Sequence, residues 1–122
     1  MKKVLVVGNC NFDGPRICKF IDSNFSAKSC EAKSIKISKD MIKKDKYDLI
    51  LVNRVCVGDG NMGLELVDYI KNENMDIPTM IITNYKDKMD EAITHGAVKG
   101  FGKEDLDSNE DKVRDVIGKV LK

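Results

Sequence analysis

Short aliphatic runs recur along the chain, and each is followed by a segment in which apolar residues have helical spacing. The first run covers residues 4–7 (VLVV) and ends at Gly8, and a second covers residues 49–52, just before Asn53. A continuous apolar run of this length, bounded by glycine or polar residues, predicts a strand buried on both faces. These two runs therefore favour a parallel sheet covered by helices.

Weaker patterns extend this alternation along the whole chain. Further strands are predicted at residues 27–34, as an edge strand, at 79–83 and within 97–102. Helices are predicted to follow Asp13 and Ser38, which are good capping residue types, and to carry the apolar positions Leu64, Val67 and Ile70, then Met89, Ala92 and Ile93, then Val113, Val116, Ile117, Val120 and Leu121. Five such units with short connections predict a doubly wound α/β sheet, formed by a single domain over residues 1–122.

Charge and composition exclude several classes of function. The net charge of +1, from 21 basic and 20 acidic residues, gives no general attraction to nucleic acid or to a membrane surface. The N-terminal residues lack the pattern of a signal peptide, and no stretch approaches membrane-spanning length, so a cytoplasmic location is expected. The four cysteines form no CxxC pair, which makes a disulfide framework improbable in a reducing compartment.

Several motifs then occur in the order found in the receiver domains of bacterial two-component response regulators. They are DLILVN at residues 48–53, GLEL at 63–66, IPTMIIT at 77–83, Gly96-Ala97 and Lys103. Over residues 3–121 the chain resembles these CheY-like receivers. The resemblance implies a flavodoxin-like, five-stranded parallel sheet with strand order 2-1-3-4-5 and helices on both faces.

Three positions depart from the family pattern. Receivers carry two acidic residues after the first strand and a phosphorylatable aspartate after the third, whereas this chain has Gly8, Asn9 and Asn53. An amide oxygen is a poor nucleophile. Phosphoryl transfer also needs Mg²⁺ to neutralise the charge on the phosphoryl oxygens, and Mg²⁺ is usually held by carboxylates. We therefore expect a degenerate pseudo-receiver that is not phosphorylated, has lost its Mg²⁺ site, has no cofactor and is not an enzyme.

The rest of the pocket leaves alternatives open. Thr83 and Lys103 match the residues that sense the phosphoryl group in the family, and Lys103 is expected either to donate to the side-chain oxygen of Asn53 or to point into water. Asp13 and Asp59 are the nearest acidic substitutes for a metal site, although Asp13 fits a helix cap and Asp59 lies in a glycine-rich loop. No catalytic residue is predicted.

The switching aromatic residue of receivers is also altered. An ungapped match places Gly100 at its position, and a shift of one residue would place Phe101 there; the ungapped match is preferred. The resemblance implies that a signalling protein partner binds the surface formed by the fourth helix, the fifth strand and the last predicted helix. The chain is expected to be a monomer or a weak dimer.

One alternative function belongs to another class. Cys10 follows the first strand and Cys56 the third, so both thiols could lie at one edge of the sheet and serve a small redox or cofactor-sensing domain. The only histidine, His95, is predicted at the end of the fourth helix, where a partial positive charge is favourable and from which it cannot complete a zinc site with these cysteines.

Overall fold

The two aliphatic runs form the central strands β1 (Lys2–Val7) and β3 (Leu49–Asn53), which lie side by side in parallel register. A computed structural model describes residues 1–121 of the chain. β2 (Ala27–Ala32) pairs with the other side of β1, and β4 (Thr79–Ile82) and β5 (Val98–Phe101) continue the sheet beyond β3. The observed strand order, 2-1-3-4-5, confirms the predicted fold class.

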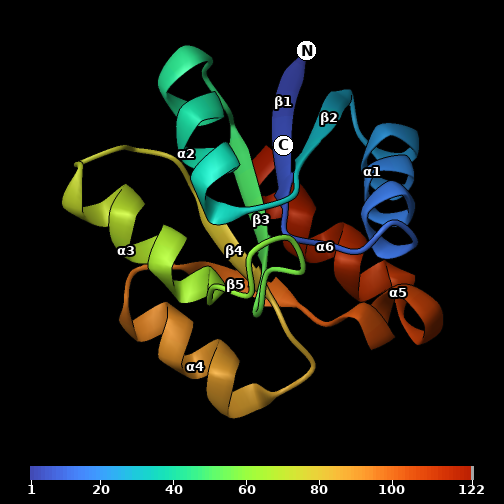
Figure 1. Cartoon of the computed structure of the whole chain (residues 1–122). Helices are drawn as coiled ribbons and strands as arrows, with labels where there is room; N and C mark the ends of the chain where they lie inside the picture. Colours follow the sequence, from blue (N-terminus) through green and yellow to red (C-terminus); the bar gives the residue numbers. More distant parts are fainter. Residues whose placement is uncertain (122) are drawn as a thin grey trace.

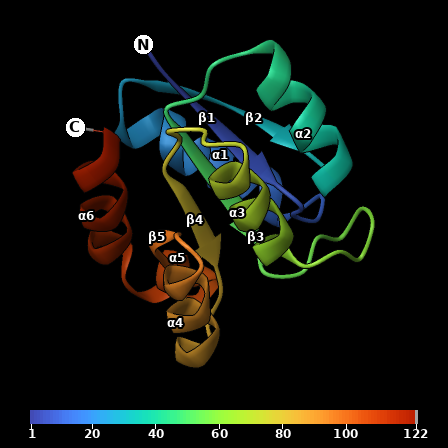
Figure 2. The same ribbon diagram turned by 90° about the vertical axis from the view of Figure 1, so that its left-hand side faces the viewer.

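Helices cover both faces of this sheet (Figure 1). α1 (Asp13–Asn24) and α6 (Glu110–Leu121) lie on one face, and α2 (Ile35–Lys44), α3 (Gly63–Asn72) and α4 (Lys86–Thr94) lie on the other. Figure 2 looks onto this second face, with α3 and α4 in front of the strands. Alternate residues of β1 serve the two cores: Val4 and Val6 face α1 and α6, and Leu5 and Val7 face α2 and α3. Burial on both faces is why β1 and β3 are continuously aliphatic.

Two predicted helix caps are wrong. The first residue of α2 is Ile35, and the side chain of Ser34 caps it by accepting the Ile37 N–H at 3.1 Å. Ser38 lies inside the helix, fully buried, and donates to the Ile35 carbonyl at 2.6 Å. Asp13 is the first residue of α1 and not its cap, which leaves its carboxylate available for tertiary contacts.

A short helix that the sequence pattern did not predict, α5 (Lys103–Ser108), follows β5. Its first turn is stabilised by Asp105, whose carboxylate accepts the Gly102 N–H at 3.0 Å. Its only buried apolar residue is Leu106, so it has no apolar stripe for a pattern to reveal. The helix predicted as the fifth is therefore α6.

The β4–β5 pairing contains a bulge, because two steps along β4, from Met80 to Ile82, match three steps along β5, from Val98 to Phe101. Phe101 is buried in the core between the sheet and α6. Gly100 lies at the bulge, where an added Cβ would come within 2.5 Å of the Ile81 carbonyl oxygen. The residue at the predicted switching position therefore has no ring to move, and the neighbouring ring belongs to the core.

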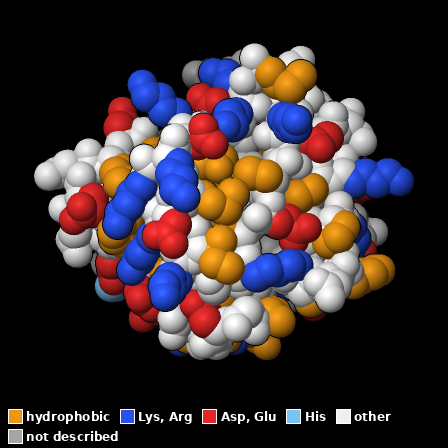
Figure 3. Space-filling view, turned by 45° about the horizontal axis from the view of Figure 1, so that its top comes forward, with side chains coloured by type: hydrophobic (Ala, Val, Ile, Leu, Met, Phe, Trp, Pro, Cys, Tyr) orange, Lys and Arg blue, Asp and Glu red, His pale blue; other side chains and the backbone are white. Residues whose placement is uncertain are grey.

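Positive and negative side chains are interspersed on the surface. Figure 3 shows Lys and Arg next to Asp and Glu across the face that it presents, in keeping with the net charge of +1. Within residues 1–121, no helix has both the length and the apolar character needed to cross a membrane.

Candidate functional site

The polar pocket lies where β1, β3 and β4 end, because the carboxyl ends of parallel strands meet at one edge of a sheet. Gly8 and Asn9 follow β1, Asn53 ends β3, and Thr83 follows β4. Lys103 reaches the same edge from the start of α5. The structure thus brings all five residues singled out in the sequence to one end of the sheet.

The side chain of Asn53 is held by its amide donors. Its Nδ2 donates to the carbonyl oxygen of Gly8 at 3.2 Å and to that of Val55 at 2.9 Å. The two bonds join the end of β1, the end of β3 and the loop of residues 54–62. A carboxylate has no hydrogen to donate, so an aspartate at this position would place an anion against two carbonyl oxygens.

Gly8 is closely packed by the loop that follows β3. Its φ is +79°, a left-handed conformation that favours glycine, and a Cβ built on it would lie 2.4 Å from the Cys56 sulfur. The Val57 N–H also donates to the Gly8 carbonyl at 3.0 Å. Cys56 therefore occupies the space that an acidic side chain at position 8 would need.

Asn9 is almost completely buried, with 1% of its surface exposed. Its Nδ2 donates to the Val7 carbonyl at 3.3 Å, while its Oδ1 has no donor among the described residues. One neutral amide oxygen and a glycine carbonyl that already accepts two hydrogen bonds make a poor ligand set for Mg²⁺, which favours carboxylates. The residues present at these positions do not fit the metal that the family resemblance implies.

Lys103 has a carboxylate partner that neither sequence-based alternative included. Its Nζ lies 3.0 Å from Asp13 Oδ2, and both side chains are mostly buried. Asp13 Oδ1 also lies 3.1 Å from the Arg16 guanidinium, which pairs in turn with Asp107. The two predictions for Lys103, a bond to Asn53 and a position in water, are both wrong, because α1 supplies the carboxylate.

The electrostatic balance at Asp13 favours the ionised form. Burial acts to raise the pKa of this carboxyl group, but the hydrogen bond from Lys103, the charge of Lys103, the contact with Cys10 and the charge of Arg16 together hold it below its ordinary value. At neutral pH the pair is Asp13⁻ with Lys103⁺. Lys103, to which the family resemblance assigns contact with a phosphoryl group, is thus already neutralised by Asp13.

The other acidic candidate, Asp59, lies away from this pair. Its Oδ2 accepts the Ile35 N–H at 3.1 Å at the start of α2, and both its oxygens also interact with Asn61. Within residues 1–121, no three Asp, Glu, His or Cys side chains converge in a way that could hold a metal ion. Asp13 binds cationic side chains and Asp59 binds backbone, so each carboxylate already has another role.

The cysteines are placed differently from one another. Cys10 Sγ lies 3.3 Å from the Asp13 backbone nitrogen and 3.5 Å from Asp13 Oδ2. Cys56 is fully buried, and this burial, with smaller effects of Asp59 and Glu65, raises the pKa of its thiol to about 12. A thiol that is protonated at neutral pH and shielded from solvent is a poor redox nucleophile, which disfavours the redox alternative.

His95 does end α4, as predicted, and its Nδ1 lies 2.8 Å from Asp68 Oδ1, a contact that the sequence did not indicate.

Two neighbours of the pocket were missed. Arg54, beside Asn53, stacks on the Tyr85 ring with its guanidinium carbon 5.3 Å from the ring centre. A cavity of about 190 Å³ lies between them and is lined by Asn53, Arg54, Val55, Ile82, Thr83, Asn84, Tyr85 and Lys103. No family motif includes Arg54 or Tyr85, so only their positions directly after two strands could have indicated them.

Solved structures with the same fold are receiver domains of response regulators. The receiver domain of NtrX from Brucella abortus has a TM-score of 0.83 at 20% identity, covering 97% of each chain. A DNA-binding response regulator of the LuxR family from Staphylococcus aureus has a TM-score of 0.85 at 14% identity, covering 100% of both chains. Against a longer NtrX chain from Brucella abortus the TM-score is 0.80 at 22% identity, covering 99% of this chain but 27% of that one. No protein-family model and no curated protein matches the sequence.

Replacing Asn53 with aspartate should destabilise the protein. N53D removes two donors and sets a carboxylate against the Gly8 and Val55 carbonyls, which we expect to cost about 1–3 kcal/mol of unfolding free energy at pH 7. Because the folded state would raise the pKa of this new carboxyl group, the deficit should shrink as pH falls from the raised pKa to the ordinary value of about 4, since the protonated acid can donate. Urea denaturation of N53D and of the parent protein at several pH values measures this difference in unfolding free energy.

The matched control is N11D, which adds the same charge at the same edge of the sheet. Asn11 is exposed and its Oδ1 already accepts from Lys33 Nζ at 3.1 Å, so a carboxylate is well placed there. N11D should unfold at nearly the same urea concentration as the parent protein. Equal stability of N53D and N11D at pH 7 would contradict the role assigned to the Asn53 amide.

The Asp13–Lys103 pair should give the protein a specific acid sensitivity. A carboxyl group whose pKa is lowered by folding contributes stability above its unfolded pKa, ordinarily 3.8, and loses it as pH falls through the folded value. A double-mutant cycle of D13N and K103M should give a coupling of about 1–2 kcal/mol at pH 7 that is lost as pH falls below 3.8 and through the lowered pKa of folded Asp13. The exposed Lys86–Asp90 pair is the control, and its coupling should be far smaller.

Proposed function

We propose that this protein is a pseudo-receiver: a protein-interaction module of a two-component or phosphorelay pathway that is not itself phosphorylated and is not an enzyme. The receiver fold supports the pathway assignment, since its structural neighbours are response-regulator receivers. The observation that carries the loss of phosphorylation is the Asn53 amide, which is bound to two carbonyl groups at the position of the phosphoacceptor.

The chemistry of the pocket supports this proposal in three ways. Asn53 offers no carboxylate nucleophile, and position 8 cannot carry an acidic side chain while Cys56 packs against it. Lys103 is neutralised by Asp13, so a phosphoryl group entering the pocket would have to displace that carboxylate. A site that has no metal-binding carboxylate pair, and whose lysine is already paired with a carboxylate, has lost the main means of stabilising phosphoryl transfer.

The partner surface we propose is the one formed by α4, β5 and α6. A groove of about 440 Å³ runs along it, lined among others by Met89 and Ile93 of α4, Gly100 of β5 and Lys112 of α6. Because Gly100 has no side chain, no ring at this position can swing between two states as the pocket changes. We infer a surface of constant shape, used by a monomer or weak dimer in the cytoplasm, without Mg²⁺, another cofactor or nucleic acid.

Phosphorylation is the direct test. After incubation with Mg²⁺ and acetyl phosphate, intact mass spectrometry should find no added phosphoryl group, while a response-regulator receiver with intact acidic residues gains one in the same buffer. Beryllofluoride with Mg²⁺ should leave the amide NMR signals of Asn53, Thr83 and Lys103 unshifted. A phosphoryl adduct on any residue of the pocket, or a saturable shift with Mg²⁺, would overturn the proposal.

A further inference from the structure

A second surface stands out at the strand ends, next to the α4–β5–α6 groove, with which its cavity shares Thr83, Asn84 and Tyr85. Nine large hydrophobic side chains are exposed within residues 1–121, and five of them lie on the loops that follow β1, β3 and β4: Phe12, Val55, Val57, Met62 and Tyr85. Phe12 is 72% exposed and Tyr85 59% exposed. Loops at the ends of neighbouring parallel strands meet at one edge, so these side chains are gathered there by the topology of the sheet. We call this edge the strand-end surface.

Its parts are joined by specific contacts. Val55 and Met62 face each other across an isolated antiparallel bridge, and Val57 is tied to the end of β1 through its bond to Gly8. The cavity of about 190 Å³ opens between Val55 and Tyr85. Exposed apolar side chains clustered around a polar depression are typical of protein interaction sites.

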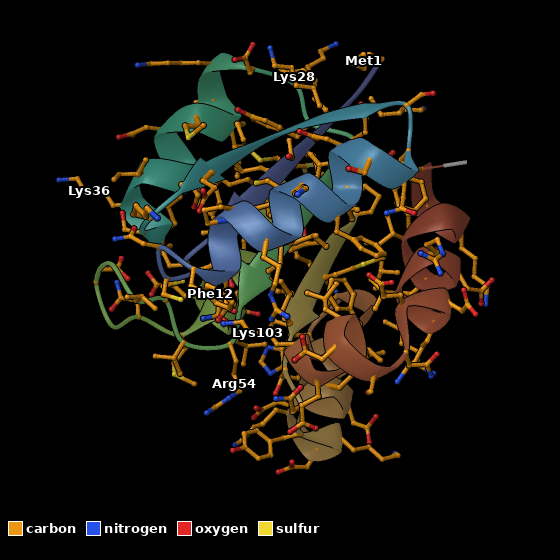
Figure 4. All side chains as sticks on the ribbon, turned by 90° about the vertical axis from the view of Figure 1, so that its right-hand side faces the viewer. Met1, Phe12, Lys28, Lys36, Arg54 and Lys103 are labelled. Atoms are coloured by element: carbon orange, nitrogen blue, oxygen red, sulfur yellow. The ribbon has the colours of Figure 1, made fainter. Side chains whose placement is uncertain are left out.

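The charged side chains that line this depression are all cationic. Its ionisable cationic side chains are Arg54 and Lys103, and no aspartate or glutamate lines it. Lys103 is balanced by Asp13, but the Arg54 guanidinium has no carboxylate within 4 Å and no hydrogen-bond acceptor among the described residues. Figure 4 labels Phe12, Lys103 and Arg54 one below another from the centre of the view downward, and Lys28 at its top. Within residues 1–121, Arg54 is thus a cation without a carboxylate partner, and its guanidinium lies over the Tyr85 ring that lines the same cavity.

We propose that the strand-end surface binds an acidic segment of a protein partner, in which an aspartate or glutamate reaches Arg54 and its apolar neighbours cover Val55, Tyr85 and Met62. A planar guanidinium fixed over a ring pairs well with a carboxylate through two parallel hydrogen bonds. A small free anion would satisfy Arg54 but leave the five apolar side chains in water, which is why a peptide fits better than phosphate. This inference rests on the proposed interaction role and adds a second contact surface with a defined chemistry.

Asn53 is part of the reason that this surface can accept a carboxylate. An aspartate there would put a negative charge in the same cavity, beside Arg54, and would repel an incoming acidic side chain. The neutral amide leaves the cavity with its cationic character. Asparagine at position 53, which under the proposed function removes the phosphoacceptor, therefore also keeps the cavity cationic and open to an acidic partner.

Selection of a displayed library of random twelve-residue peptides on the full chain tests this proposal. Enriched peptides should combine Asp or Glu with aliphatic or aromatic residues, and a synthetic copy should shift the NMR signals of Arg54, Val55 and Tyr85. R54Q should weaken its binding about tenfold. Y85A should also weaken it, because the ring supports the guanidinium. Changing the acidic residue of the peptide to its amide should have the same effect as R54Q.

Two matched variants separate the possible results. K28Q removes one exposed positive charge at the opposite edge and should leave affinity unchanged, and I93A truncates an exposed apolar side chain of the α4–β5–α6 groove and should do the same. No enriched peptide, or equal weakening by R54Q and K28Q, would overturn the proposal. Peptide binding that is weakened by I93A but not by R54Q would overturn this proposal and leave the interaction role intact. Phosphorylation of the pocket would overturn the interaction role separately. Inorganic phosphate that alone reproduces the shifts and displaces the peptide would reduce the site to a small-anion site.

Discussion

A single amide group joins the parts of this molecule that define its pocket. The two donors of Asn53 Nδ2 reach the carbonyl groups of Gly8 and Val55, so the end of β1, the end of β3 and the loop after β3 share one centre. Buried or half-buried carbonyls need donors, and a side-chain amide can supply two where a carboxylate supplies none. Asparagine at this position is therefore part of the local structure and not merely the loss of an acid.

The same loop closes the space beside β1. Cys56 packs against Gly8 at a distance that excludes any side chain there, and the left-handed conformation of Gly8 adds a second barrier. Restoring an acidic pocket would need changes at several coupled positions, because a carboxylate at position 8 clashes with Cys56 and one at position 53 faces two carbonyls. The residues at positions 8 and 53 are thus linked through the loop after β3, and a carboxylate placed at either position alone would be unfavourable.

The fold was accessible from the sequence because its signals are local. Aliphatic runs at β1 and β3 need burial on both faces, and the apolar spacing of α6 repeats with the helical period, so both were predicted correctly. Asn53 was singled out by its position after a buried strand, and the resemblance to receivers pointed to Gly8, Asn9, Thr83 and Lys103. What escaped prediction depends on long-range geometry: the pairing of Asp13 with Lys103 joins residues on α1 and α5, and α5 itself has only one buried apolar residue. Ser34 and Ser38 are both plausible caps, and tertiary burial of Ser38 decided between them.

Charge at the strand ends follows from where each carboxylate is used. Asp13 pairs with Lys103 and, together with Asp107, with Arg16, and Asp59 binds the backbone at the start of α2, so neither Asp13 nor Asp59 remains for Arg54. A receiver with three carboxylates in this pocket presents a negative, metal-binding centre to its surroundings. Here the same edge carries one unbalanced guanidinium within a rim of exposed apolar side chains. This difference in charge is the basis for proposing an acidic, partly apolar segment as the partner of this edge. The proposed loss of phosphorylation and the proposed preference for an acidic partner would then both follow from the uncharged residues at positions 8, 9 and 53.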